Sequence, residues 1–310
     1  MIRSRAIART LCLAGLPVLC LFLSGSGLSS TVSSVISLPL SSRQAGMGGL
    51  GMGGDDPGAA WENPAAPAQP GGGRVVLTAG GGSLFAGDRQ LLVIGGSGRL
   101  GERSTLSAIL LSSGQSFDEL DIHGDPMGQK ISEDTLVGAI VGSFRVGDRW
   151  AVGLSVRGLY DELAGAGTSW VGADAGAKAW WGKMQAGVSV RNLGPGIRRN
   201  ADVPADSLPA EIRASFIAQP IPSLLAGIGY VSILGRSDQL EVGAEWRPAA
   251  ALALRGGLEG FLDADIQPSL GLSVAVRQFT LDYAFVAHPA GAGHRLGVTA
   301  SWGRGGDGVR

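Results

Sequence analysis

Apolar and polar side chains alternate along most of the chain from about residue 75 onward. In the segment 279–285 every second residue is large and apolar, and the residues between are small or polar. The same alternation runs through 240–247 and 295–302. Successive side chains of a β-strand point to opposite faces, so each segment predicts a strand with one apolar and one polar face. Segments of about ten residues with this pattern are typical of transmembrane barrels.

The alternation predicts about fourteen strands, separated by segments rich in Gly, Pro, Asn and Asp. They are expected near 74–85, 89–97, 103–113, 134–146, 149–160, 168–181, 183–192, 210–219, 223–234, 238–247, 250–260, 267–276, 278–288 and 294–303. Several joins are short enough for hairpins. The longer joins at 114–133 and 193–209 suit outward-facing loops. This arrangement predicts an all-β fold, a transmembrane antiparallel β-barrel of about 14 strands.

The polar face of the predicted strands carries many charges. These charged residues occupy the strand positions that alternate with the apolar ones: Arg157, Arg191, Glu241, Glu245, Arg247, Arg255, Glu259, Arg277, Asp282 and Arg295. A charge facing lipid costs about 2–4 kcal/mol at the membrane midplane, whereas charges inside a lumen can pair. We therefore expect this face to line the lumen. The alternative is a soluble β-sandwich that turns its apolar face to a core.

Small and aromatic residues add to the barrel interpretation. On the polar face, Gly153, Gly187, Gly243 and Gly297 leave room for charged side chains or for a plug. Six aromatic residues fall near predicted strand ends, as in the aromatic girdles of membrane barrels. They are Trp150, Tyr160, Trp170, Trp180, Trp246 and Trp302.

The N-terminus has the order of a secretory signal peptide: a basic stretch, an apolar run at 11–23, and small residues. The run is shorter than the roughly 20 residues of a spanning helix, although an uncleaved anchor is the alternative. Both cysteines, Cys12 and Cys20, lie in this segment. We therefore expect an exported chain without a disulfide or a thiolate metal site.

Composition narrows the range of partners. The 310 residues carry 25 Lys and Arg against 26 Asp and Glu, so a nucleic-acid partner is not expected. After the signal, no window offers about 18 consecutive apolar residues, and no helical span is expected. Residues 43–70 are dense in Gly, Ala and Pro and lack strand alternation, but Asp56 before Pro57 predicts one helical turn.

Three motifs follow one another in a characteristic order. They read AGMGG at 45–49, DDP at 55–57 and WENPA at 61–65, then RNLGPG at 191–196, and finally LDYAFV at 281–286 with GHRL at 293–296. In this order they resemble the PorV/PorQ family, within the FadL-like class of outer-membrane barrels.

The resemblance implies a fourteen-stranded barrel of the bacterial outer membrane with an N-terminal hatch in the lumen. It divides the chain into a signal peptide at 1–28, a linker and hatch at 29–72, a barrel at 73–303 and a tail at 304–310. FadL-like members pass hydrophobic small molecules across the membrane, whereas PorV-like members serve as accessory, docking barrels of a protein-secretion system. The implied partners are outer-membrane lipid, the barrel-assembly machinery, and either hydrophobic small molecules or secretion-system proteins.

The hatch of this resemblance holds the best candidate functional residues: Asp55, Asp56, Asn63 and Pro64. Their polar groups could bond the expected lumen arginines, such as Arg157 or Arg255, and so hold a plug that a ligand must shift. The alternative is that they only cap turns.

Other chemistry has weaker support, and neither a cofactor nor an enzymatic activity is expected. The glycines of 95–101 resemble a dinucleotide-binding turn, but a strand rather than a helix follows, which favours a hairpin. The acidic residues of 118–125 lack the alternating ligands of a calcium loop. Asp282, His294 and Ser301 could form a hydrolase triad only on one face and within hydrogen-bond reach. An outer-membrane enzyme is therefore the third hypothesis, after a conduit and a docking barrel.

Overall fold

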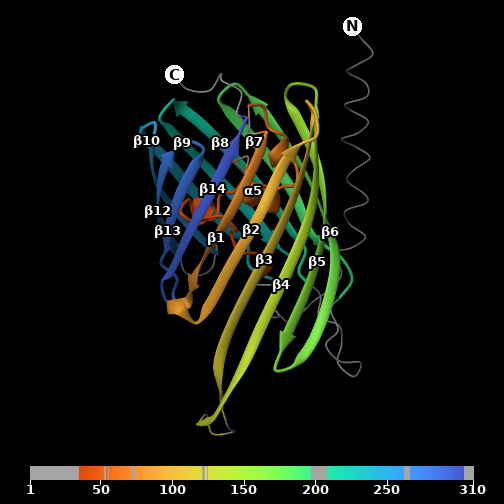
Figure 1. The fold of residues 1–310 in the computed structure, drawn as a ribbon, viewed down its shortest axis with the longest axis vertical. Coiled ribbons are helices and arrows are strands. Elements are labelled where there is room, and N and C mark those ends of the chain that lie inside the picture. The colour runs from red at the N-terminus through yellow and green to blue at the C-terminus, as the bar shows by residue number, and fades with distance from the viewer. Residues whose placement is uncertain are drawn as a thin grey trace.

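Fourteen antiparallel strands close into a barrel in the computed structural model, which describes residues 35–51, 54, 56–71, 74–120, 123, 125–196, 208–261 and 266–303. Each strand pairs with its neighbours in sequence, and the first and last pair to close the ring (Figure 1). The predicted barrel is thus confirmed. The strands are β1 Val75–Leu84, β2 Arg89–Arg99, β3 Ser104–Leu120, β4 Pro126–Val146, β5 Trp150–Leu163, β6 Ala166–Trp181, β7 Met184–Leu193, β8 Glu211–Ile221, β9 Leu224–Ile233, β10 Gln239–Ala249, β11 Leu252–Phe261, β12 Ile266–Val276, β13 Phe279–Val286 and β14 Gly293–Trp302.

The two faces of the wall differ as the alternation predicts. In β5, Leu154 and Val156 are exposed on the outer face, and Leu154 is 69% exposed. Their neighbours Ser155 and Arg157 are buried on the inner face. A soluble sandwich would bury the apolar face and expose the polar one. The closed barrel does the reverse, and the sandwich alternative is excluded.

The wall is taller on one side than the sequence indicates. The stretch 114–133, expected to be a loop, continues as strand to Leu120 and resumes at Pro126, with Phe117 opposite Ile131. In Figure 1 this β3–β4 hairpin extends beyond the other strands. Its two strands satisfy each other's backbone hydrogen bonds, so the ribbon persists where the neighbouring strands have ended. The second long join lies largely outside the described residues, because 197–207 are not among them.

The aromatic residues divide between the two faces. Trp150, Tyr160, Trp246 and Trp302 are exposed on the outer face, as expected for girdle positions. Trp170 is 3% exposed, and its indole Nε1 donates a 2.7 Å hydrogen bond to the carbonyl of Pro195. The prediction of a girdle position is therefore wrong for two of the six residues, Trp170 and Trp180.

The burial pattern of β6 explains why Trp170 and Trp180 face inward. From residue 168 to 174 its buried positions are the even-numbered ones, so Trp170 is inward; Trp180 is partly buried against Ala65 and Ala68, and Trp181 is exposed outside. The adjacent tryptophans Trp180 and Trp181 give no period of their own, so the sequence does not say which of them faces lipid.

The described part of residues 35–71, here called the N-terminal segment, packs against the inner face of the wall. It contains the helices α4 Ser42–Ala45 and α5 Pro57–Glu62 and the 3₁₀ turn η2 Ala66–Ala68. The helix α4 contacts β12 to β14, α5 contacts β1 to β3, and η2 contacts β3 to β5. Figure 1 shows α5 within the ring of strands. No helix among the residues described here is long and apolar enough to cross a membrane.

The predicted helical turn after residue 56 is confirmed. Asp56 is the N-cap of α5, and its carboxylate accepts a 3.2 Å hydrogen bond from the backbone N–H of Ala59. Pro57 occupies the first helical position, where its missing N–H costs nothing. Every residue of this short helix is buried. Its stability therefore comes from contacts with the wall rather than from its length.

The exposed apolar band predicts how the chain responds to a charge on its outer face. The variant Leu154→Arg is expected to lose about 2–4 kcal/mol of folding free energy in lipid bilayers, because a guanidinium would face hydrocarbon. Urea titration of the refolded barrel in vesicles, followed by tryptophan fluorescence, measures this loss. Asp148→Arg, in the tight turn before β5, is the control and should change the free energy by less than about 1 kcal/mol. Equal effects of the two variants would contradict a lipid-facing Leu154.

Candidate functional site

The half of the barrel interior along β2 to β5 is largely apolar, although it also contains the buried ion pair Arg89–Glu133 at 2.8 Å. Inward side chains of β2 to β5 form a continuous cluster with residues of the N-terminal segment. The wall contributes Leu91, Val93, Ile109, Leu111, Val137, Ala139, Val141 and Leu159, and the segment contributes Val35, Ile36, Leu40, Ala60 and Trp61. We call the eight wall residues the apolar patch. The N-terminal segment covers the patch with side chains that are themselves apolar.

Sequence reasoning missed the apolar patch because it expected a polar lumen throughout. A signal was present: runs such as 91–94 and 109–111 are apolar without interruption. A strand with apolar residues on both faces reads as a buried strand rather than an alternating one. These strands are therefore apolar toward the outside and toward the N-terminal segment.

The other half of the interior, from β7 to β14, is charged. Its buried groups form ion pairs from strand to strand, as the sequence-based phase predicts for a lumen face. The pairs are Arg191–Glu211 at 3.0 Å, Arg213–Glu211 at 3.3 Å, Arg213–Glu241 at 3.0 Å, Arg255–Glu245 at 2.7 Å and Arg255–Asp282 at 2.8 Å. On the opposite side, Arg157 pairs with Asp174 at 2.8 Å. Each pair compensates charges that would be costly to bury alone.

The N-terminal segment completes this network with two charges of its own. Glu62, at the end of α5, lies 3.2 Å from a guanidinium nitrogen of Arg191 and 2.8 Å from one of Arg213. Arg43, in α4, lies 2.9 Å from a carboxylate oxygen of Glu245. Burial alone would lower the pKa of Arg43, but the Glu245 carboxylate raises this pKa above its ordinary value. Sequence reasoning missed Glu62 and Arg43 because neither lies in an alternating strand.

Wall arginines also bind the backbone of the N-terminal segment. Five of them donate hydrogen bonds to its carbonyl oxygens: Arg191 to Ile36 at 2.9 Å, Arg213 to Ser37 at 3.4 Å, Arg157 to Trp61 at 3.3 Å, Arg99 to Gln69 at 2.7 Å, and Arg295 to Pro39. Three of these contacts lie on the stretch 36–39, which includes a turn. The wall thus fixes the course of the backbone, while the side chains of the same stretch contact the apolar patch.

The predicted hatch residues bind mainly backbone groups. Asp55 lies outside the described residues, and Asp56 caps α5. The amide nitrogen of Asn63 donates 3.1 Å hydrogen bonds to carbonyls of β6 and β7, at Ala177 and Val188. The carbonyl of Pro64 accepts a 2.6 Å hydrogen bond from a wall serine of β4. Asn63 therefore anchors the segment through its side-chain amide to wall carbonyls, and Pro64 through its own carbonyl to a wall hydroxyl.

Glycines on the inner face of the wall lie where the backbone of the N-terminal segment comes closest to the strands. A Cβ atom at Gly153 would overlap the backbone at Pro64, and one at Gly243 would overlap the backbone at Met47. Side chains at these two positions would push the segment away from the wall. Both glycines are among the four that the sequence indicates as making room for a plug.

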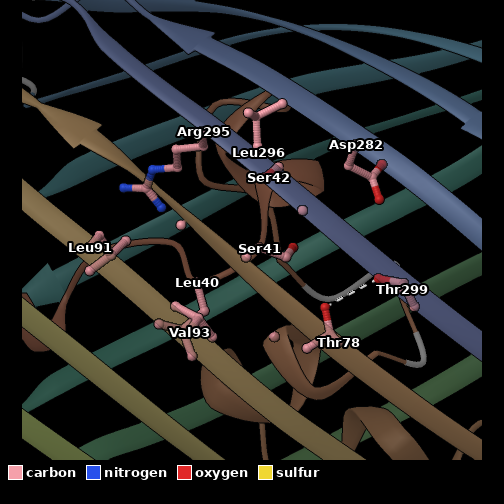
Figure 2. A pocket seen from close by; sticks show the side chains of 14 residues that line it. Leu40, Ser41, Ser42, Thr78, Leu91, Val93, Asp282, Arg295, Leu296 and Thr299 are labelled. Atoms are coloured by element: carbon pink, nitrogen blue, oxygen red, sulfur yellow. Dashed lines mark hydrogen bonds between the residues drawn. The ribbon is translucent and has the colours of Figure 1, made fainter.

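Two cavities lie between the N-terminal segment and the wall. Figure 2 shows the smaller, of about 20 Å³, where Leu40 meets Leu91 and Val93, with Arg295 on its other side. This volume is close to that of one water. The larger cavity, of about 170 Å³, lies at the barrel end that carries the joins 84–89, 233–239 and 286–293. Its lining combines apolar residues of the segment and the strand ends with polar side chains.

The remaining sequence candidates do not assemble into a site. The glycines of 95–101 belong to the hairpin between β2 and β3. His294 is outside, where its Nδ1 lies 2.8 Å from the hydroxyl of Tyr283, whereas Asp282 points inward to Arg255, so the triad is not formed. Within the described part of the chain, no group of three or more His, Cys, Asp or Glu could hold a metal ion.

The fold is similar to that of known outer-membrane transport barrels. The toluene transporter TodX of Pseudomonas putida is 12% identical, with a TM-score of 0.64 over 86% of this chain and 98% of that one. A Pseudomonas aeruginosa FadL homologue is 12% identical, with a TM-score of 0.60 over 90% and 99%. The monoaromatic hydrocarbon channel CymD is 14% identical, with a TM-score of 0.61 over 90% and 98%.

These likenesses show that the chain has a FadL-type barrel fold. No protein-family model matches the chain, and no curated protein sequence matches it. None of the three structures is a PorV or PorQ protein, so that finer resemblance stays a prediction.

The ion network predicts a large difference between a buried and an exposed arginine. Arg213→Met leaves Glu62, Glu211 and Glu241 short of a cation and is expected to lower the free energy of unfolding by about 3–5 kcal/mol. Arg247→Met is the control: its side chain is 55% exposed, and its partner Glu245 keeps Arg255. It should cost about 0–1 kcal/mol. Urea unfolding in detergent micelles compares the two, and a loss below about 1 kcal/mol for Arg213→Met would contradict the network.

Proposed function

We propose that this protein is an outer-membrane barrel that conducts hydrophobic small molecules, with the N-terminal segment as its hatch. The observation that carries the proposal is the apolar patch. It gives part of the interior a surface on which apolar molecules could travel, and most of the residues that cover it belong to the N-terminal segment, with Trp170 and Leu208 in the same cluster. The similar folds of barrels described as hydrocarbon transporters support the same class of function.

The location in an outer membrane rests on the outer face of the barrel. That face presents large apolar residues on every strand, among them Leu110, Ile140, Leu154, Val171, Leu270 and Leu296. A surface of this extent is favourable in hydrocarbon and unfavourable in water. The predicted signal peptide would deliver the chain, although it lies outside the described residues.

The hatch has apolar side chains on one side and polar contacts on the other, and this difference would allow it to move. Its apolar side chains match the patch, so a hydrophobic molecule can replace them there with little change in burial. Its polar contacts are with arginines and carboxylates that also pair with one another, as Arg213 does with Glu211 and Glu241. The wall charges thus retain partners when Glu62 withdraws. This allows the segment to shift without leaving isolated buried charges behind.

The alternative of a docking barrel for secreted proteins is not proposed. The comparisons give it no support, and the apolar surface with a defined cover lies inside the barrel. An interior surface suits a small molecule that passes through the wall or lumen rather than a folded protein.

A disulfide that can be formed and then reduced tests whether the N-terminal segment must move for transport. A Cβ atom at Gly297 of β14 would lie 3.7 Å from the Cβ of Ser42 in α4, within the range of about 3.5–4.5 Å for a disulfide. The exported chain is predicted to have no cysteine, so Ser42→Cys with Gly297→Cys introduces one defined bond. Oxidation is expected to lower the uptake of labelled toluene into vesicles at least tenfold, and a reductant should restore it.

The controls separate the effect of the disulfide from that of the substitutions. Each single variant, Ser42→Cys or Gly297→Cys, should transport equally with oxidant and with reductant. Full transport by the completely oxidised double variant would overturn the moving hatch. Absence of toluene uptake in the unmodified protein and in all variants would overturn the conduit itself.

A further inference from the structure

The larger cavity has one apolar and one polar side. The apolar side consists of Leu38 and Pro39 of the N-terminal segment with Leu84, Phe85, Ile233 and Val286 of the wall and its joins. The polar side includes Glu259 on β11, Arg295 on β14, and the amides Gln239 and Gln267. At about 170 Å³ the cavity has room for a small organic molecule rather than a single water.

Glu259 is the unusual group in this cavity. It is partly buried, and its carboxylate forms neither a hydrogen bond nor an ion pair with any residue that the structure describes. Its cross-strand neighbours are Glu241 on one side and Gln267 on the other. Glu241 is bound to Arg213 at 3.0 Å, so that cation is engaged elsewhere. Glu259 is therefore a hydrogen-bond acceptor that the protein leaves open toward the cavity.

Arg295 supplies the complementary donor. One guanidinium nitrogen of this buried residue donates to the carbonyl of Pro39, but its Nε is buried without a hydrogen-bond partner among the described residues. Arg295 and Glu259 line the same cavity and form no direct ion pair. The cavity is thus lined by an unpaired carboxylate, by a guanidinium that has one N–H group without a partner among the residues described, and by two amides, all next to an apolar surface.

We propose that this cavity binds a small, mainly apolar molecule that carries a hydroxyl group, such as a phenol or an alcohol. A hydroxyl donates one hydrogen bond and accepts others, so it can donate to Glu259 and accept from Arg295. The apolar body would lie against Leu38, Leu84 and Phe85. The inference rests on the proposed function, since it names the substrate class that the conduit would admit.

The same two groups disfavour other classes of ligand. A plain hydrocarbon would cover the carboxylate and the guanidinium without pairing either, which costs about 1–3 kcal/mol for each unsatisfied group. An organic ion of either sign would be attracted by one of these two groups but repelled by the other, so its charge brings no net gain. A neutral hydroxyl satisfies both groups without adding a charge.

A matched pair of ligands tests the inference. Binding of p-cresol and of toluene, which differ by one hydroxyl, is measured by ligand-observed NMR on the refolded, full exported chain in detergent. p-Cresol is expected to bind at least tenfold more tightly than toluene. In Glu259→Leu this preference should fall to about twofold or less, because the acceptor is replaced by an apolar side chain.

Two further variants keep the result interpretable. Glu102→Leu, in an exposed turn, is the control and should retain the full preference. Glu259→Gln keeps the shape of the side chain and relieves the repulsion from Glu241, so it should fold even where Glu259→Leu does not. Its preference for p-cresol should fall at least threefold, since a charged acceptor forms the stronger hydrogen bond.

The outcomes separate this inference from the proposed function. Equal binding of the two ligands, or a preference that survives both Glu259 substitutions, would overturn the hydroxyl site. If vesicles containing the protein still take up toluene in that case, the conduit stands. A protein that neither binds p-cresol nor takes up toluene would overturn both proposals.

Discussion

Charge compensation inside the barrel determines where the N-terminal segment lies. A closed wall with apolar residues outside must turn its polar face inward, where each charge needs a partner. The strands provide most of these partners, but Glu62 and Arg43 come from the N-terminal segment and pair with Arg191, Arg213 and Glu245. These pairs fix the segment on one side of the lumen. Its apolar side chains are thereby placed on the other.

The two halves of the interior are coupled by the stretch 36–39. Its carbonyl oxygens accept hydrogen bonds from wall arginines, and neighbouring apolar side chains lie against the apolar patch. One short piece of chain thus satisfies charged groups and covers apolar surface at the same time. A molecule that competes for either surface acts on the same stretch, which is why a ligand cavity lined by Leu38 and Pro39 bears on the whole segment.

Local alternation predicts the barrel well because it follows from the geometry of a single strand. It gives the strand number, the closed all-β fold and the inward phase of residues such as Arg157, Glu241 and Asp282. It fails where a residue's surroundings are set by distant parts of the chain. Local alternation does not predict the apolar patch, because β2 to β4 have apolar residues on both faces. Only the closed fold shows that one of these faces contacts Trp61 and Ile36. The partners of Glu62 lie about 130 to 150 positions away in sequence, beyond the reach of any local pattern.

In the proposed function, the N-terminal segment moves away from the apolar patch when a hydrophobic ligand binds. Hydrogen–deuterium exchange of the refolded barrel, with and without toluene, tests it most directly. We expect faster exchange in the peptides that cover 35–51 when toluene is present, whereas peptides from β3 to β5 remain protected. Unchanged exchange of 35–51 at a toluene concentration that saturates transport would contradict the claim.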